Sequence, residues 1–304
     1  MGRRRFFYAS AAALLVCVGL SYVHQSGLLA DHLARLRREA TQAVPVLREI
    51  AATAGTERRR YSLVPILCFH NIDGKGPYSV SRAEFRGYLE RIRDNGITVI
   101  PLRELQAAAE ENRLLDRPSI VITIDDDYKN IVRVGAPLLR EFRYPATFFF
   151  YTIDIMNDPR WGTSWDDLRR LYDEGFDVQN HSYTHTIFHI RLPGESRAEY
   201  DLRVHREIYT SREILQQNLP DAELYAFAYP MGYFSADLRS RLENAGYELL
   251  LTTDSNPVDL TKPFTGTFDR YTIQKRFVKN PEAMFQLQLQ YALSPHESGD
   301  VAAD

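Results

Sequence analysis

The sequence predicts an α/β fold, a distorted (β/α)7-type barrel that forms a single domain. Strand-like apolar runs alternate with helical stretches from Tyr61 onward, and this alternation is typical of a parallel sheet covered by helices. The runs are continuously apolar, as expected of strands buried on both faces. The chain has 304 residues, enough for one large domain with appendages. A doubly wound sheet is the alternative.

Seven strands and intervening helices are expected in this domain. The strands are placed at residues 63–69, 97–100, 119–124, 146–152, 176–180, 224–229 and 247–253. Two helices, 81–96 and 164–175, each start with a serine that is followed three residues later by an acidic residue, and each stops at a glycine. That pattern is a capping box with a glycine stop. One last helix completes a domain of residues 61–292, and residues 293–304 form a disordered tail.

The N-terminus predicts a membrane anchor. Three arginines at positions 3–5 precede residues 6–23, which carry no charge and are close to the shortest length that spans a bilayer. We expect residues 1–26 to be an uncleaved, single-pass signal anchor in the inner membrane, with the α/β domain outside the cytoplasm. A cleaved signal peptide is the alternative. Residues 27–60 predict a helical stalk, broken at Pro45.

Charge and cysteine content narrow the class of protein further. Residues 1–60 hold ten arginines and four acids, so the rest of this chain of net charge −3 carries −9. An acidic body binds nucleic acid poorly, and no nucleic-acid partner is expected. The two cysteines are Cys17, in the apolar segment, and Cys68, so the fold depends on its core and not on a disulfide framework.

Chemistry-bearing residues end three of the predicted strands. "TIDDDY" ends one strand in aspartates 125–127, "NHSYTH" ends a second with His181 and His185, and a third ends in His70. Each feature alone is also common as a helix cap, a solvated loop or a rim residue. In α/β barrels, however, the working residues lie at the carboxyl ends of strands. An aspartate with two histidines suits zinc, a helical turn would aim both rings the same way, and a second carboxylate beside the metal could act as a base.

These segments resemble the NodB-homology polysaccharide deacetylases, carbohydrate esterase family 4. "TIDDDY" and "NHSYTH" correspond to that family's T-F-D-D-G-Y and N-H-[ST]-x-x-H, and the similarity extends through "PATFFFYT" and "FAYPMGYFS" to cover roughly residues 63–276. "PILCFHNID" resembles the poly-N-acetylglucosamine deacetylase branch, in which the Leu-x-x-His element stands at the start of the domain.

The resemblance implies a role for each matching residue. Asp125 would be the general base, and His70 the general acid that protonates the leaving amine. The backbone N–H of Met231 would help to hold the oxyanion. The ligands of a Zn²⁺ ion, with Co²⁺ or Ni²⁺ as alternatives, would be Asp126, His181 and His185.

Three positions depart from the family pattern. Asp127 stands where the family has a glycine, and aspartate tolerates a left-handed backbone there better than most residues do. Ala228 stands where many members carry an arginine that positions the base, and Met231 replaces an aromatic residue. Arg270, in "FDRYTI", is a candidate to replace the missing arginine.

Several further residues are candidates for the rim of the site. His189 would be a third imidazole, or otherwise a surface histidine. The following aromatic residues would stack on sugar rings, or otherwise pack in the core: Trp161, Tyr183, Tyr229 and Tyr233.

The resemblance implies a membrane-anchored, zinc-dependent N-deacetylase of an N-acetylhexosamine polysaccharide. Its substrate would be an exopolysaccharide of the kind that builds biofilms, and export machinery for that polymer is a candidate partner. One alternative is a glycan-binding protein that has kept the barrel and lost catalysis, as Asp127 and Ala228 would allow. Another is a deacetylase or esterase that acts on peptidoglycan or on a small amide.

Overall fold

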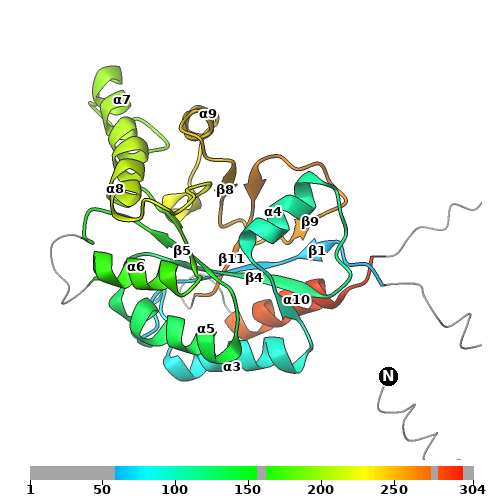
Figure 1. Ribbon diagram of the computed structural model, residues 1–304. Helices are drawn as coiled ribbons and strands as arrows, with labels where there is room; N and C mark the ends of the chain where they lie inside the picture. Colours follow the sequence, from blue (N-terminus) through cyan, green and yellow to red (C-terminus); the bar gives the residue numbers. More distant parts are fainter. Residues whose placement is uncertain (1–58, 156–161, 275–279, 297–304) are drawn as a thin grey trace, which may run out of the picture. The chain divides into compact units, whose positions relative to one another are not determined.

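A computed structural model describes residues 59–155, 162–274 and 280–296, which belong to a compact unit that begins at Arg59. Nine strands of this described part form one parallel sheet in the order β10-β8-β7-β6-β5-β4-β2-β11, with β3 paired to β4 (Figure 1). From β2 to β8 the strands follow chain order, without the reversal that marks a doubly wound sheet. The predicted parallel α/β architecture is therefore confirmed, and the doubly wound alternative is wrong.

The predicted strands are all present, and three short ones after residue 257 were not anticipated. Proline has no N–H for a central ladder, and the run at 63–69 is interrupted at Pro65 into β1 and β2. β1 (Leu63–Val64) pairs antiparallel with β9 (Val258–Asp259) in a separate ribbon. The strands of the main sheet are β2 (Ile66–Phe69), β3 (Thr98–Val99), β4 (Ser119–Asp125), β5 (Thr147–Phe150), β6 (Asp177–Asn180), β7 (Ala226–Ala228), β8 (Leu249–Leu251), β10 (Thr267–Phe268) and β11 (Tyr271–Thr272).

The two edges of the sheet are linked by only two residues. β10 runs parallel to β8 at one edge, and β11 runs parallel to β2 at the other. The chain therefore passes from one edge to the other through Asp269 and Arg270. This short crossing requires the sheet to curl into a half-barrel, because the edges of a flat sheet would be too far apart.

Helices cover the strands, and the two predicted capping boxes are confirmed. The hydroxyls of Ser81 and Ser164 accept the N–H of Glu84 and Asp167, whose carboxylates accept the serine N–H groups in return. The helices are α3 (Arg82–Asp94), α4 (Leu102–Glu110), α5 (Ala136–Phe142), α6 (Trp165–Asp173), α7 (Arg197–His205), α8 (Ser211–Asn218), α9 (Ala236–Asn244) and α10 (Pro281–Leu293), with single turns η1 (Ile131–Gly135), η2 (Arg206–Thr210) and η3 (Pro230–Gly232).

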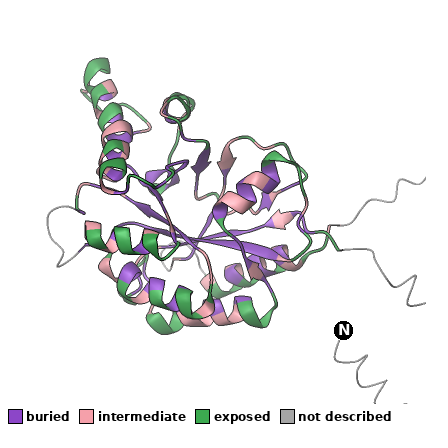
Figure 2. Cartoon of the chain, in the orientation of Figure 1, coloured by how far each residue is buried: buried purple, intermediate pink, exposed green. Residues whose placement is uncertain are grey.

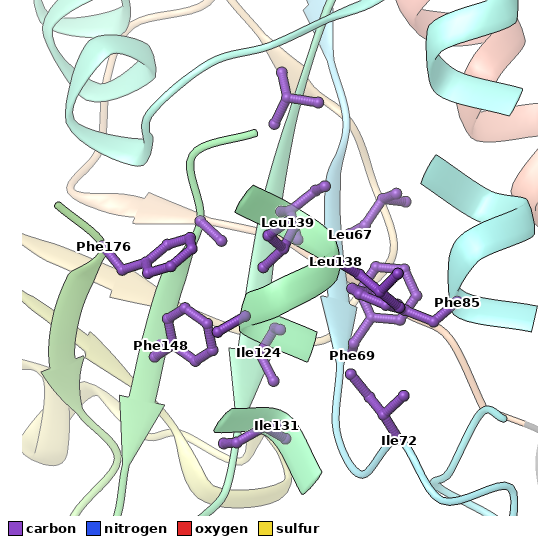
Figure 3. Close-up of a cluster of buried hydrophobic side chains, with 14 of the residues drawn as sticks. Leu67, Phe69, Ile72, Phe85, Ile124, Ile131, Leu138, Leu139, Phe148 and Phe176 are labelled. Atoms are coloured by element: carbon purple, nitrogen blue, oxygen red, sulfur yellow. The ribbon is translucent and has the colours of Figure 1, made fainter. Parts of the chain in front are cut away.

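The main core lies between the sheet and the helices α3, α5, α6 and α10 (Figure 3). The strands are buried, whereas the helices bury one side and expose the other (Figure 2). Phe69 and Phe85 meet edge to face with ring centroids 4.9 Å apart, and Tyr88 meets Phe285 at 4.6 Å. Burying each such ring contributes about 2–3 kcal/mol, so α3 and α10 are held to the sheet mainly by aromatic packing.

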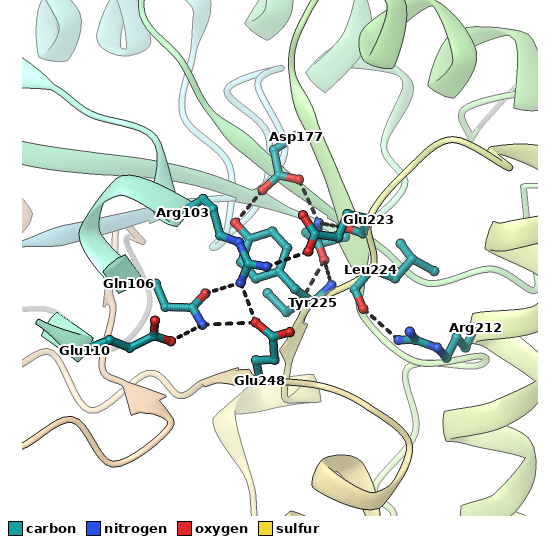
Figure 4. A network of polar contacts seen from close by, with 11 residues as sticks. Arg103, Gln106, Glu110, Asp177, Arg212, Glu223, Leu224, Tyr225 and Glu248 are labelled. Atoms are coloured by element: carbon teal, nitrogen blue, oxygen red, sulfur yellow. Dashed lines mark hydrogen bonds and ion pairs between the residues drawn. The ribbon is translucent and has the colours of Figure 1, made fainter. Parts of the chain in front are cut away.

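A polar network closes the amino-terminal end of the strands (Figure 4). Arg103 of α4 donates hydrogen bonds to Glu248 at 2.6 Å and to Glu223 at 2.5 Å. Asp177, the first residue of β6, accepts a hydrogen bond from the hydroxyl of Tyr225 at 2.9 Å. In this class of fold that end serves stability, while the chemistry lies at the opposite end.

The predicted anchor at residues 1–26 lies outside the described residues, as does the stalk at 27–60 except for its last two positions. No helix within the described ranges is both long and apolar enough to cross a bilayer. The predicted disordered tail is described only as far as residue 296.

Candidate active site

Three adjacent aspartates end the central strand β4. Asp125 is the last residue of the strand and is 2 % exposed, and Asp126 and Asp127 are 8 % and 5 % exposed. A buried carboxylate costs several kcal/mol unless it is paired and hydrogen-bonded. The partners of the three side chains therefore decide what each one can do.

Asp125 is paired with a buried arginine from the crossing between β10 and β11. Arg270, fully buried, donates from Nη1 to Oδ1 at 2.7 Å and from Nη2 to Oδ2 at 2.8 Å. Burial raises the pKa of Asp125, but the charge and hydrogen bonds of Arg270, together with His181 and His70, outweigh burial and hold that pKa well below its usual range. Arg270, the candidate replacement for the arginine missing at Ala228, thus contacts the expected base from the crossing between β10 and β11.

Asp126 lies beside the two histidines of the predicted metal site. His185 Nε2 is 3.6 Å and His181 Nε2 is 3.9 Å from Asp126 Oδ1. The ligand atoms of all three residues lie within 4.8 Å of one another. His181 Nδ1 lies 2.8 Å from the carbonyl oxygen of Ala228, so Nδ1 carries the proton and Nε2 keeps its lone pair for a metal. The donor set therefore fits a divalent cation such as zinc.

The protonation states of this trio also suit a metal. Burial lowers the pKa of His181 to about 3 and also lowers that of His185, so both imidazoles are neutral at pH 7, as metal ligands must be. Burial, followed by repulsion from Asp125 and Asp127, raises the pKa of Asp126 to about 6. A bound cation would offset that increase, because its positive charge favours the ionised carboxylate.

The two histidines are brought together by a strained loop and not by a helical turn, so that expectation is wrong. Ser182 and His185 have left-handed backbones, with φ of 78° and 56°. The hydroxyl of Ser182 accepts the N–H of His185 at 3.0 Å. A non-glycine residue in this region costs of order 1–3 kcal/mol, so surrounding contacts must hold the loop.

The left-handed residue among the aspartates is Asp126, with φ of 75°, and not Asp127. The position where the family has glycine therefore does not need a left-handed backbone in this chain. Asp127 accepts a hydrogen bond from Tyr151, and its Oδ2 lies only 2.8 Å from where a Cβ on Gly162 would be. Burial raises the pKa of Asp127. This carboxylate thus packs between β5 and the segment that contains Gly162.

One cavity of about 550 Å³ contains the expected base, the metal trio, the expected acid and several aromatic residues. A larger cavity of about 790 Å³, around residues 256–269, contains neither histidines nor the aspartates 125–127, so the smaller one is the candidate site. It is lined by His70, Tyr78, Asp125, Asp126, Tyr128, Tyr151, His181, His185, Tyr229, Met231, Tyr233, Thr253, Thr272 and Gln274.

His70 and Met231 lie in this cavity, as predicted for the acid and the oxyanion donor. His70 follows β2, and its Nδ1 is buried without a hydrogen-bond partner among the described residues. Met231 follows β7 in the turn η3 with φ of 57°. It is 45 % exposed, which leaves this turn accessible to a substrate.

Some of the residues predicted for the rim of the site line the cavity, and others do not. Tyr233 lines the cavity and is 53 % exposed, whereas Tyr229 is 1 % exposed, so it is not the exposed rim residue that we expected. His189 packs against Tyr233 at 5.2 Å between ring centroids, outside the metal trio. Tyr183 does not line the cavity. Trp161 lies outside the described residues.

Sequence reasoning missed three exposed or partly exposed tyrosines that line the cavity. Tyr78 and Tyr128 are 36 % and 41 % exposed, and Tyr151 contacts His185 with ring centroids 5.5 Å apart. Tyr151 directly follows β5, so its place at a strand end was a usable signal. Tyr78 lies in a loop, where the sequence carries no such signal.

Comparison with known proteins identifies this chain as similar to hydrolases that remove acetyl groups from polysaccharides. Residues 113–250 match the family model described as polysaccharide deacetylase. Poly-β-1,6-N-acetyl-D-glucosamine N-deacetylase of Staphylococcus epidermidis is 25 % identical over 209 residues, which are 67 % of this chain and 69 % of that protein. Chitooligosaccharide deacetylase of Bradyrhizobium sp. is 29 % identical over 129 residues, which are 42 % of this chain and 52 % of that protein.

Solved structures show the same fold. IcaB from Ammonifex degensii superimposes with a TM-score of 0.65 at 18 % identity, covering 77 % of this chain and 98 % of that one. The Streptococcus pyogenes deacetylase PplD, in complex with acetate, gives a TM-score of 0.62 at 20 % identity, covering 74 % and 97 %. The resemblance to the polysaccharide deacetylases that the motifs predicted is therefore confirmed, over residues 113–250 by the family model and over 209 residues by the staphylococcal relative.

Proposed function

We propose that this protein is a metal-dependent N-deacetylase that removes acetyl groups from an N-acetylhexosamine exopolysaccharide, with a β-1,6-linked N-acetylglucosamine polymer as the first candidate substrate. The observation that supports it best is the convergence of Asp126, His181 and His185 within 4.8 Å, beside Asp125 and in the same cavity as His70. The similarity to poly-β-1,6-N-acetyl-D-glucosamine deacetylases supports the choice of substrate.

Asp126, His181 and His185 would hold the cation, with Zn²⁺ favoured and Co²⁺ or Ni²⁺ as alternatives. A bound divalent ion supplies a Lewis acid and lowers the pKa of a nearby water to about 7. Two features of these residues support cation binding. Two neutral imidazoles and a carboxylate lie close together, and the carbonyl of Ala228 fixes the tautomer of His181.

Asp125 is suited to the role of general base. Arg270 keeps the carboxylate ionised at neutral pH, so it can accept a proton from the attacking water. The same two hydrogen bonds fix its orientation. Since Arg270 stands in for the arginine absent at Ala228, that absence no longer favours a binding protein without catalysis.

His70 and Met231 complete the reaction. His70 would give a proton to the departing amine, since its ring lies in the cavity and its buried Nδ1 has no other hydrogen-bond partner in the described part. The N–H of Met231 would stabilise the negative charge that develops on the acetamide oxygen; losing one such donor typically costs about 10²–10³-fold in kcat. Tyr233, which is exposed at the cavity, would stack on a sugar ring.

The test is acetate release by the purified protein from β-1,6- and β-1,4-linked N-acetylglucosamine oligomers, after loading with Zn²⁺, Co²⁺ or Ni²⁺. We expect release from the β-1,6 series and its loss in Asp125→Asn. Release from the β-1,4 series alone would assign another linkage. Binding of both oligomers without any release would contradict the enzyme and favour the glycan-binding alternative.

We also propose that residues 1–26 anchor the protein in the cell membrane with the catalytic domain outside the cytoplasm. The support is the uncharged segment 6–23 behind three arginines. Protease added to spheroplasts should then digest the domain while cytoplasmic proteins survive. Full protection of the domain would contradict this location. Polymer export machinery would be the natural partner there.

A further inference from the structure

A buried carboxylate outside the cavity contacts the loop that connects the two histidines. Glu207 lies in the π-helical turn η2 between α7 and α8 and is 0 % exposed. No arginine or lysine of the described part forms an ion pair with it. Burying a carboxylate is costly unless its oxygens are hydrogen-bonded, so the hydrogen bonds of Glu207 must compensate.

Among the described residues, all of the hydrogen bonds to this carboxylate come from residues 181–185, which we call the histidine loop. Glu207 Oε2 accepts the backbone N–H groups of Tyr183 and Thr184 at 3.1 and 2.8 Å, and Oε1 accepts the hydroxyl of Thr184 at 2.7 Å. These two residues lie directly between left-handed Ser182 and left-handed His185. The carboxylate therefore holds the strained segment at its middle.

The helical segment that contains Glu207 is also hydrogen-bonded to the end of β6, the strand that precedes the histidine loop. The hydroxyl of Ser211 donates to the carbonyl of Glu207 at 2.7 Å and accepts from Asn180 Nδ2 at 2.8 Å. Asn180 Oδ1 accepts the N–H of Ser182 at 2.8 Å. π-Turns often occur at functional sites, because the extra residue redirects side chains of the helix. Here Glu207 belongs to the π-turn η2, and its carboxylate accepts hydrogen bonds from Tyr183 and Thr184, the two residues before His185.

We propose that Glu207 is a positioning residue for the metal centre. Its carboxylate fixes the Tyr183–Thr184 peptides so that Nε2 of His185 stays within reach of Asp126. The proposal rests on the proposed function as far as the metal is concerned. Its structural part concerns the metal-free loop and can be tested without either metal or polysaccharide.

The first experiment measures metal affinity in Glu207→Gln, which keeps the size of the side chain but removes its charge and half of its acceptor oxygens. Outer residues that orient metal ligands typically change affinity by about 10–100-fold, so we expect Zn²⁺ affinity, measured by competition with a chromophoric chelator, to fall by that factor. The visible spectrum of the Co²⁺ form should also change, since it reports ligand geometry.

The second experiment measures hydrogen exchange of residues 181–186 in the metal-free protein. In Glu207→Gln, the backbone amides of Tyr183 and Thr184 should exchange their hydrogens faster than in the wild type. If Glu207→Gln does not fold, Thr184→Val removes only the hydroxyl donor and should produce the same changes on a smaller, severalfold scale.

Asp177→Asn is the matched control. Asp177 begins the same strand that leads into the histidine loop, and it accepts hydrogen bonds from Thr147, Gln179 and Tyr225. This variant should lose stability while keeping its metal affinity, its Co²⁺ spectrum and its exchange in 181–186.

Unchanged exchange, affinity and spectrum in Glu207→Gln would overturn the proposal, as would equal losses in the control. If exchange is faster in Glu207→Gln but the wild-type protein binds no metal or releases no acetate, the proposed function alone would be refuted.

Discussion

Replacing Arg270 by methionine should destabilise the protein more than any comparable change at its surface. Arg270 is 0 % exposed and Asp125 2 %, and the two hydrogen bonds between them measure 2.7 and 2.8 Å. Removing one partner of a buried pair leaves the other charge uncompensated, and we expect a loss of about 3–5 kcal/mol in the free energy of unfolding. Arg270→Lys keeps the charge but not the paired geometry, so its loss should be intermediate.

The pH dependence of this loss has a definite sign. The guanidinium holds the pKa of Asp125 below its unfolded value of about 3.9. A lowered folded-state pKa contributes stability that is fully present above the unfolded pKa and is lost as the pH falls through the folded pKa. The difference between wild type and Arg270→Met should therefore be largest at neutral pH and should shrink below about pH 4.

Urea unfolding of the metal-free proteins, followed by circular dichroism, measures both effects. The control is Arg86→Met, because Arg86 makes the same two-bond contact with Glu141 at the surface, where the side chains are 33 % and 52 % exposed. Solvent screens that pair, and its loss should not shift the midpoint measurably. Equal midpoints for Arg270→Met and Arg86→Met at neutral pH would refute the reasoning.

Three further predictions concern the metal, a turn and the core. Zinc affinity, measured by titration calorimetry, should fall about tenfold for each pH unit below 6, because the pKa of Asp126 is about 6 in the metal-free site and a proton then competes with the cation; an affinity that does not change with pH would contradict this. Gly232→Ala should cost about 2 kcal/mol or more in urea unfolding, since φ is +75° and the new Cβ would lie 3.1 Å from the backbone nitrogen of Thr253 and closer still to its hydroxyl. An unchanged free energy of unfolding in Gly232→Ala would show that this turn can relax around the new Cβ. Phe85→Ala should lower the free energy of unfolding by about 3–5 kcal/mol, because Phe85 is 0 % exposed against Phe69; a loss below about 1 kcal/mol would mean that the core collapses around the cavity.

Sequence patterns located the parts of the site that lie at the ends of long, apolar strands. "SIVITI" and "FDVQN" carry enough continuous hydrophobicity to be recognised as buried strands, so Asp125 and His181 could be placed at their carboxyl ends. β10 and β11 have only two residues each. No periodicity exists in such short strands, and the crossing that positions Arg270 could only be suggested by the need to replace a missing arginine.

The histidine loop shows a different limit of sequence reasoning. The spacing His-x3-His is compatible with a helical turn, but the left-handed backbones of Ser182 and His185 result from contacts with residues that are distant in sequence. Glu207 belongs to "REIYTSREIL", a stretch rich in charged and polar residues in which a glutamate is normally solvent-exposed. Its burial depends on the π-turn and on the loop it contacts, which tertiary structure alone determines.

Three adjacent carboxylates are tolerated at the end of β4 because each has a different partner. Arg270 compensates Asp125, so that charge persists at neutral pH. Asp126 faces two neutral imidazoles and has a raised pKa, so its charge depends on a cation. Asp127 is stabilised by the hydroxyl of Tyr151. The left-handed backbone at Asp126 makes this separation feasible, since it turns the chain sharply between neighbours. The partner that each carboxylate meets thus sets its pKa, and the proposed base and the proposed metal ligand can stand next to each other because Asp125 and Asp126 titrate in different pH ranges.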